Sequence, residues 1–326
     1  MNETPETLLK IEDLRLSFKK DTGLARVLDG VCLEIRRSGI LGLIGETGCG
    51  KSVTGDAVLG LIPRPPGIME AGRVWFKGRD LLRLPEKEMR AVRGREIAMI
   101  LQDPFTALNP VYTVGRQIVE TITLHQDLRG SAARRQASTI MSAVGIPEPD
   151  QRMNHYPHQF SGGLRQRAAI AMALSCQPDL LIADEPTTAL DVTVQAQILE
   201  LLSQLNRNLG TAILLISHDL GVISSLCHRV AIMYSGTVVE NAGLEDFFEA
   251  PLHPYSQALL GAIPRLATRR DELAVIKGQI PDLVDPPLGC RFHPRCSQVA
   301  ERCRREKPVL KSAAADHQVA CFKVTG

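Results

Sequence analysis

A short segment near the N-terminus has the residues of a phosphate-binding loop. Its sequence, GETGCGKS, fits the pattern G-x-x-x-x-G-K-[ST]. Glycines let successive backbone N–H groups converge on phosphate oxygens, the lysine adds a positive charge, and the serine hydroxyl can ligate Mg²⁺. An apolar run, GILGLIG, leads into the loop and a helical pattern, VTGDAVLGLI, follows it, which is the strand–loop–helix setting that this chemistry requires. The predicted phosphate-binding residues are Gly45, Glu46, Thr47, Gly48, Cys49, Gly50, Lys51 and Ser52.

Two carboxylates follow another apolar run. In LLIADEPTTALD the run delivers Asp184 and Glu185 to the end of a predicted strand. Asp184 can hold Mg²⁺ through water, and Glu185 can orient or deprotonate an attacking water. His218 ends a further apolar run, AILLISH, where it is either an ordinary loop residue or a hydrogen-bond donor to a transferring phosphoryl group. Together with a phosphate loop, these side chains predict phosphoryl-transfer chemistry.

A pair of glycines opens a predicted helix in FSGGLRQRAAIAMA. Ser161 lies at the cap, and Gly162 and Gly163 begin the helix. Backbone N–H groups at a helix start favour an anion, yet no lysine stands beside these glycines to hold a phosphate. The alternative is that the small residues allow close packing of two helices.

The elements that must position these residues alternate along the chain. Strands are predicted at residues 8–18, 39–45, 72–78, 96–102, 179–186, 211–219 and 229–236, and helices at 53–62 and 192–210 and from Ser161 onward. Such alternation is typical of an α/β fold with a mostly parallel sheet. Residues 111–145 are helical and polar in pattern, and proline-rich and then cysteine-rich sequence follows residue 250. We place a domain boundary near residue 263.

The charge balance and the apolar runs of the chain exclude some classes of protein. The 326 residues include 38 Lys+Arg and 36 Asp+Glu, a net charge of +2, so no global charge favours nucleic acid or an anionic membrane. No apolar run approaches the ~18–20 residues that span a bilayer, and the first residues lack the pattern of a secretory signal. We expect a cytoplasmic protein that other subunits bring to a membrane.

The ordered set of motifs resembles the nucleotide-binding subunit of an ATP-binding cassette (ABC) transporter. The set comprises the phosphate loop, ILQDP, FSGGLRQR, LLIADEP, ALD and SHD, and the resemblance covers about residues 8–250. It implies an α/β P-loop NTPase core of the ABC type over residues 1–262, with an antiparallel β subdomain and an α-helical subdomain at about 103–167. It also implies that two cassettes pair head to tail around ATP and Mg²⁺.

The same resemblance assigns roles to single residues. Gln102 senses Mg²⁺ and the attacking water, and together with Ser52 and Asp184 it completes the predicted Mg²⁺ site. Ser161, Gly162 and Gly163 close over the γ-phosphate of ATP bound by the partner cassette, which explains the missing lysine. Phe18 stands where an aromatic ring stacks on adenine, or it belongs to the core. Glu185 and His218 are implied as catalytic residues, and Asp191 lies at the dimer interface.

The C-terminal part resembles the extension of the oligopeptide, dipeptide and nickel importer branch. EAPLHPYSQALLGAIPRL and GCRFHPRCSQVAERC carry this resemblance. Residues 263–326 form the predicted extension, whose cysteines follow C-x5-C-x6-C-x17-C. Four thiolates can hold a [4Fe–4S] cluster or a tetrahedral Zn²⁺; we favour the cluster, because close C-x2-C pairs are absent, over zinc or reduced thiols. The predicted ligands are Cys290, Cys296, Cys303 and Cys321.

The resemblance implies an ATPase that powers peptide import at the cytoplasmic face of the cell membrane. Its implied partners are a second, non-identical ABC subunit, two transmembrane permeases and an extracytoplasmic solute-binding protein, with no nucleic acid. Nickel chelates, glutathione or oligosaccharides are alternative cargoes. A soluble ABC ATPase that acts on nucleic acid is the alternative of another class.

Overall fold

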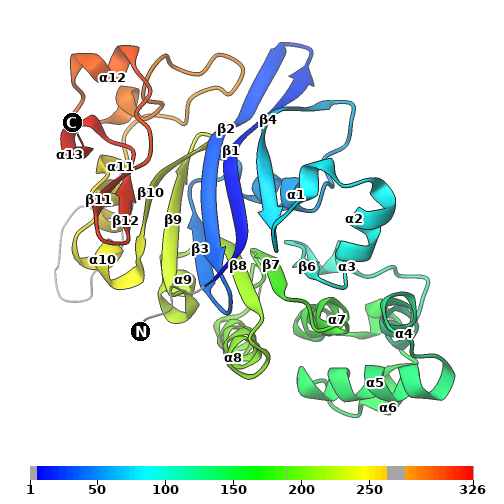
Figure 1. Ribbon diagram of the computed structural model, residues 1–326. Coiled ribbons are helices and arrows are strands. Elements are labelled where there is room, and N and C mark those ends of the chain that lie inside the picture. Colours follow the sequence, from blue (N-terminus) through cyan, green and yellow to red (C-terminus); the bar gives the residue numbers. More distant parts are fainter. Residues whose placement is uncertain (1–5, 189, 263–275, 326) are drawn as a thin grey trace. The chain divides into compact units, whose positions relative to one another are not determined.

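The computed structural model describes residues 6–188, 190–262 and 276–325 (Figure 1). The predicted extension boundary at residue 263 and Ala189 lie outside the described residues. The chain divides into two compact units, each described by itself. The first unit comprises Met1–Leu8, Ile35–Ile40 and Arg83–Ile216, and the second comprises Leu9–Glu34, Leu41–Leu82 and Ser217–Gly326.

The second unit contains a four-stranded antiparallel sheet. Its strands are β1 (Thr7–Lys20), β2 (Gly23–Arg36), β4 (Gly67–Phe76) and β5 (Arg79–Asp80), in the order β2-β1-β4-β5. Buried and exposed residues alternate along much of β1, as expected for a strand with one face in the core. The predicted strand at 72–78 overlaps the second half of β4, which ends at Phe76 and forms a hairpin with β5.

The second unit also contains strands of a mixed sheet. The strands β3 (Ile40–Ile44) and β9 (Arg229–Tyr234) are parallel, whereas β10 (Thr237–Gly243), β12 (His317–Val319) and β11 (Lys311–Ala314) continue the sheet with antiparallel pairing. All five residues of β3 are buried. The C-terminal residues therefore contribute strands to the same sheet as the strand that precedes the phosphate loop. The helices of this unit are α1 (Lys51–Val58), α9 (Leu220–Leu226), α10 (Leu244–Glu249), α11 (Pro254–Gly261), α12 (Glu301–Arg305) and α13 (Phe322–Thr325).

The first unit is built on three parallel strands. These are β6 (Ile97–Ile100), β7 (Leu180–Asp184) and β8 (Ala212–Ser217), with β7 paired to both neighbours. Every residue of β7 and β8 is buried, which accounts for their continuous apolar sequence. The long helix α8 (Val192–Leu209) ends at Gly210, whose φ of 69° is typical of a helix C-terminus. The α/β class is as predicted, and the pairing in the larger sheet is mixed, with both parallel and antiparallel neighbours.

Helices fill the segment between β6 and β7 (Figure 1). They are α3 (Pro104–Ala107), α4 (Val114–His125), α5 (Gly130–Ala143), α6 (Pro149–Arg152) and α7 (Gly162–Leu174). Buried residues at every fourth position, Val114, Ile118 and Ile122, give α4 one apolar face. In the described parts of the chain, no helix combines the length and hydropathy needed to cross a bilayer.

Candidate functional site

The phosphate loop connects β3 to α1 in the second unit. A side chain cannot be accommodated at Gly45, because a Cβ there would lie 2.2 Å from the carbonyl oxygen of Met233. Gly50 has a φ of 107° and is the N-cap of α1, without a side-chain cap. The first turn of α1 therefore offers backbone N–H groups to a phosphate.

The side chain of Lys51 packs against the backbone of the phosphate loop. Its side chain is buried, and Nζ donates hydrogen bonds to the carbonyl oxygens of Gly45 at 2.7 Å and Glu46 at 3.2 Å. These carbonyls hold the ammonium group over the loop, where a β- or γ-phosphate can exchange for them. Ser52 follows in the first turn and is half-buried, whereas Thr47 and Gly48 are exposed.

Cys49 supports the phosphate loop through a backbone hydrogen bond and not through its thiol. Burial raises the pKa of its thiol to about 11, so the side chain stays protonated and unreactive near neutral pH. Its carbonyl oxygen accepts a hydrogen bond from the N–H of Gly236 at 2.8 Å. This contact connects the phosphate loop to the turn between β9 and β10.

Phe18 lies near the end of β1 in the second unit. It is half-buried, its β4 partner is Gly67, and its ring is 3.4 Å from the position that a Cβ of that glycine would occupy. Half-burial leaves part of the ring accessible for stacking. Both predicted roles, core packing and adenine stacking, are compatible with this placement.

Asp184 and Glu185 stand at the end of β7 in the first unit. Asp184 is only 4% exposed. Glu185 leaves the strand with a φ of 45°, and its N–H donates to the carbonyl oxygen of Ile216 at 2.9 Å. A positive φ is unfavourable for a non-glycine residue, and the hydrogen bond to β8 holds the backbone in this conformation.

The carboxylate of Glu185 is oriented by two donors. Gln102 Nε2 donates to Oε2 at 3.0 Å, and the hydroxyl of Thr188 donates to the same oxygen at 2.9 Å. The structure thus brings together Gln102 and Glu185, which are 83 positions apart. The sequence prediction did not name Thr188 as a candidate site residue, although it lies in the same DEPTTALD segment.

The two glycines at the start of α7 have different surroundings, and each corresponds to one of the two predicted roles. The Ser161 hydroxyl accepts from the N–H of Leu164 at 3.4 Å, which confirms its capping position. A Cβ at Gly163 would lie 2.9 Å from Val194 Cγ1 in α8, whereas a Cβ at Gly162 would meet nothing within 4 Å. Gly163 therefore serves helix packing, and Gly162 presents open backbone. Asp191 caps α8 by accepting from Val194 N–H at 2.9 Å.

His218 belongs to the second unit, directly after β8. Its side chain is exposed, on a turn in which Asp219 N–H donates to the Ser217 hydroxyl at 3.0 Å. The Asp219 carboxylate in turn caps α9 by accepting from Gly221 N–H at 2.7 Å. These bonds define the backbone that presents the imidazole. The predicted ATP-site residues thus occur in two sets: the phosphate loop, Phe18 and His218 in the second unit, and the others in the first.

The four C-terminal cysteines line one cavity in the second unit. Cys290, Cys296, Cys303 and Cys321 share it with His253 and Phe292, among other residues. Burial raises the pKa of Cys290 to about 11 and also raises that of Cys296, so these thiols are protonated near neutral pH. Across the described ranges, no three His, Cys, Asp or Glu side chains are placed to hold a metal ion. The structure therefore does not support the predicted iron–sulfur site or the zinc alternative.

The basic residues around these cysteines have carboxylate partners. Arg291 and Lys307 pair with Asp29, and Arg295 pairs with Glu46. The three arginines on α12 pair with Glu301 or Glu306. These basic residues therefore form ion pairs within the protein.

Comparison with known proteins gives matches over nearly the whole chain. Residues 28–188 match the family model described as ABC transporter, and residues 239–303 match that of the oligopeptide/dipeptide transporter C-terminal region. The chain is 47% identical over 323 residues to the probable peptide ABC transporter ATP-binding protein y4tR of Sinorhizobium fredii, covering 99% of this chain and 96% of that protein. It is 46% identical over 317 residues to the dipeptide transport ATP-binding protein DppD of Bacillus subtilis, covering 97% and 95%.

A solved structure shares the fold of the larger part of the chain. It is the dimeric, post-hydrolysis state of the ATP-binding cassette MJ0796 bound to ADP and Pi, with a TM-score of 0.66 and 26% identity. The alignment covers 73% of this chain and 99% of that one.

Proposed function

Because this chain belongs to the family of ATP-binding subunits of peptide ABC transporters, we propose that it powers the import of dipeptides or oligopeptides across the cytoplasmic membrane. The predicted ABC ATPase is confirmed: the chain is an ATP-hydrolysing transport subunit. The observation that carries the choice of cargo is the match of residues 239–303 to the oligopeptide/dipeptide transporter C-terminal region.

Each predicted site residue has a role in the proposed hydrolysis reaction. The phosphate loop and Lys51 bind the β- and γ-phosphates, and Ser52, Asp184 and Gln102 would hold Mg²⁺. When bound, Mg²⁺ would supply charge stabilisation at the transferring phosphoryl group. Glu185 orients and deprotonates the attacking water, with Gln102 and Thr188 fixing its carboxylate. His218 donates a hydrogen bond to the γ-phosphate.

The proposed catalytic pocket is shared between two cassettes. Gly162, with the open space around its Cβ position, presents the N-terminus of α7 to the γ-phosphate on the partner subunit, and Asp191 lies near that interface. The partner is a second, non-identical ABC subunit. Two transmembrane permeases and an extracytoplasmic solute-binding protein complete the transporter, which places this subunit at the cytoplasmic face of the membrane.

The test is ATP hydrolysis by the assembled transporter in lipid vesicles. We expect permeases, binding protein and a dipeptide together to raise ATPase activity severalfold over that of the isolated chain, and Lys51→Ala to abolish the gain. Stimulation by DNA or RNA, with none by the permeases and peptide, would establish the nucleic-acid alternative instead.

A [4Fe–4S] cluster at the cysteine cavity stays a proposal of its own. Its support is the lining of one cavity by all four C-terminal cysteines, against which stands their arrangement, which does not match a metal site. Anaerobic purification followed by iron, sulfide and zinc analysis tests it. A brown protein with iron and sulfide would establish the cluster, and a colourless, iron-free preparation would refute it.

A further inference from the structure

The segment Cys290–Cys296 (CRFHPRC) lies against the phosphate loop and its supports. We propose that Arg295, in this segment, is a positioning residue for ATP, which it serves by holding Glu46 of the phosphate loop in place. The proposal rests on the ATPase function given above. It assigns the C-terminal segment a role in nucleotide affinity.

Arg295 contacts the loop through one nitrogen of its guanidinium. Its side chain is 5% exposed, and Nη1 lies 3.0 and 3.1 Å from the two carboxylate oxygens of Glu46. Further hydrogen bonds from the guanidinium go to the hydroxyl of Tyr234 at 3.3 Å and the carbonyl oxygen of Lys277 at 3.0 Å. A guanidinium held by several acceptors in a buried setting has few alternative positions.

Glu46 is also held at its backbone. Its N–H donates to the hydroxyl of Tyr255 at 3.2 Å, and Tyr255 is fully buried against the ring of Tyr234. The carbonyl oxygen of Glu46 accepts from Lys51 Nζ at 3.2 Å. One residue therefore connects Arg295 to the lysine that binds phosphate, and a shift of its side chain displaces a carbonyl in the phosphate site.

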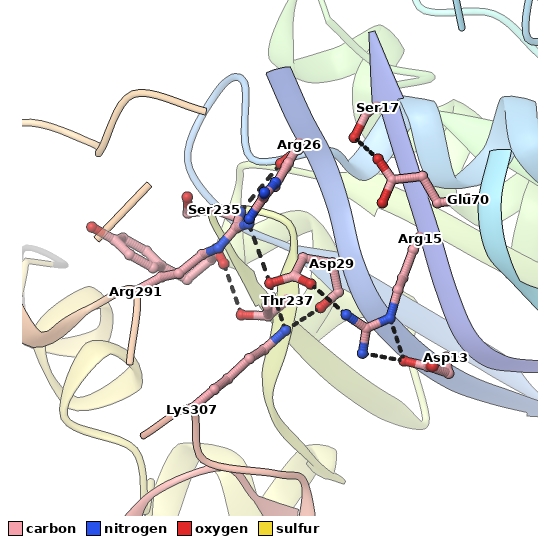
Figure 2. Close-up of polar contacts among 11 residues, drawn as sticks. Asp13, Arg15, Ser17, Arg26, Asp29, Glu70, Ser235, Thr237, Arg291 and Lys307 are labelled. Atoms are coloured by element: carbon pink, nitrogen blue, oxygen red, sulfur yellow. Dashed lines mark hydrogen bonds and ion pairs between the residues drawn. The ribbon is translucent and has the colours of Figure 1, made fainter. Parts of the chain in front are cut away.

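Arg291 anchors the other end of the same segment (Figure 2). Its side chain is 4% exposed, Nη1 donates to the carbonyl oxygen of Ser235 at 2.5 Å, and Nη2 lies 3.2 Å from Asp29 Oδ2. Gly236, which follows Ser235, donates its N–H to the carbonyl oxygen of Cys49 at 2.8 Å. The segment thus contacts the phosphate loop through Glu46 and supports it through the Ser235–Gly236 turn.

Asp29 ties this anchor to β2 (Figure 2). Its carboxylate accepts from Lys307 at 2.6 Å and from Arg15 at 3.1 Å, besides Arg291. Cys290 and Cys296, which flank the two arginines at the ends of the segment, line the cysteine cavity. Because contacts hold both ends of the segment, the position of Arg295 beside Glu46 is fixed.

The test measures ATP binding by the full chain, with a fluorescent mant-ATP analogue and Mg²⁺. Arg295→Ala and Glu46→Gln break the same ion pair from its two ends, and we expect each to raise Kd about tenfold. The double variant should bind no more weakly than the weaker single variant, since both act through one contact. Arg295→Lys keeps the charge without the planar fork and should recover part of the affinity.

Arg305→Ala is the matched control. This arginine comes from the same C-terminal region, is largely exposed and pairs with Glu301 within α12, so its loss should leave Kd unchanged. In the assembled transporter we expect Arg295→Ala to raise the KM for ATP and to leave kcat nearly unchanged.

Three results would overturn the proposal. They are an unchanged Kd in both single variants, fully additive losses in the double variant, or a loss of kcat at unchanged KM. If Arg295→Ala does not fold, Glu46→Gln decides the question, because it removes the charge with little change in volume. Failure of the unaltered chain to bind the analogue would instead refute the ATPase function.

Discussion

At the scale of single residues, chemistry depends on side chains that are held before substrate arrives. Glu185 combines a positive φ with two hydrogen bonds to one carboxylate oxygen. Backbone strain of this kind persists only where the surroundings enforce it, and here β8 and Gln102 do so. The carboxylate of Glu185 is therefore oriented by the protein.

Replacement of Glu185 by Gln should separate binding from hydrolysis. The amide keeps the shape of the side chain but cannot accept a proton, so we expect kcat to fall by about 10²-fold or more, with mant-ATP affinity retained. Turnover and binding are measured on the same assembled transporter. Unchanged turnover would show that another group is the base.

Asp29 gives a prediction with a defined pH dependence. Burial raises the pKa of its carboxyl, but the hydrogen bond and charge of Lys307 and the charges of Arg291 and Arg15 outweigh burial, so the pKa lies below its ordinary value. A lowered folded-state pKa contributes stability that is present above the ordinary aspartate pKa and is lost as pH falls below it.

Asp29→Asn should therefore lower the free energy of unfolding at pH 7 by about 1–3 kcal/mol. Urea unfolding at a series of pH values measures the difference from the unaltered chain, which should shrink as pH falls below the ordinary aspartate pKa. A difference that stays constant between pH 7 and pH 3 would contradict the ion-pair origin of the effect.

At the scale of elements, helix starts and strand ends place the reactive groups. The helix α7 begins at a serine cap and two glycines, of which one packs on α8 and the other is open. The strand β7 is buried along its whole length and ends at Asp184. The start of α7 and the end of β7 therefore each position residues of the predicted site.

The two glycines of α7 should respond differently to alanine. Gly163→Ala pushes a Cβ to 2.9 Å from Val194 Cγ1, so we expect a loss of about 1–3 kcal/mol in the free energy of unfolding. Gly162→Ala meets open space and should leave stability unchanged or slightly higher, while lowering the ATPase rate of the assembled transporter.

Thermal unfolding and ATPase assays compare the two variants side by side. Full activity in Gly162→Ala, with folding intact, would mean that the start of α7 does not approach the partner's phosphate. Equal losses of stability in both variants would contradict the division of roles between the two glycines.

At the scale of the whole molecule, the residues for hydrolysis are distributed over two compact units, and the glycine pair has no phosphate-binding lysine beside it. In the proposed function the site is completed by a partner cassette, so activity should follow assembly. The related cassette MJ0796 is described as dimeric in its ADP- and Pi-bound state.

The isolated chain should hydrolyse ATP slowly, with a specific activity that rises with protein concentration or on addition of the second ABC subunit. Concentration dependence is the expected signature because dimers form by mass action. Steady-state ATPase assays over a hundredfold range of concentration measure it. A high specific activity that is independent of concentration and of partners would refute the shared pocket.

The sequence by itself determined the ATPase chemistry and the order of the elements. The phosphate loop, the Asp184–Glu185 pair and the Ser161 cap are contiguous motifs, and local backbone geometry acts on neighbours in the chain. The predicted strands and the helical segment between β6 and β7 follow from the same local patterns of burial.

Only the tertiary structure decided which distant residues meet. Arg295 pairs with Glu46 across 249 positions, and Thr188 and Gln102 meet on one oxygen of Glu185. The cysteine spacing predicted a cluster, yet the thiols line a cavity without the arrangement of a metal site. Such contacts depend on the path of the chain and on the direction of each side chain, and neither is encoded by the spacing of residue types.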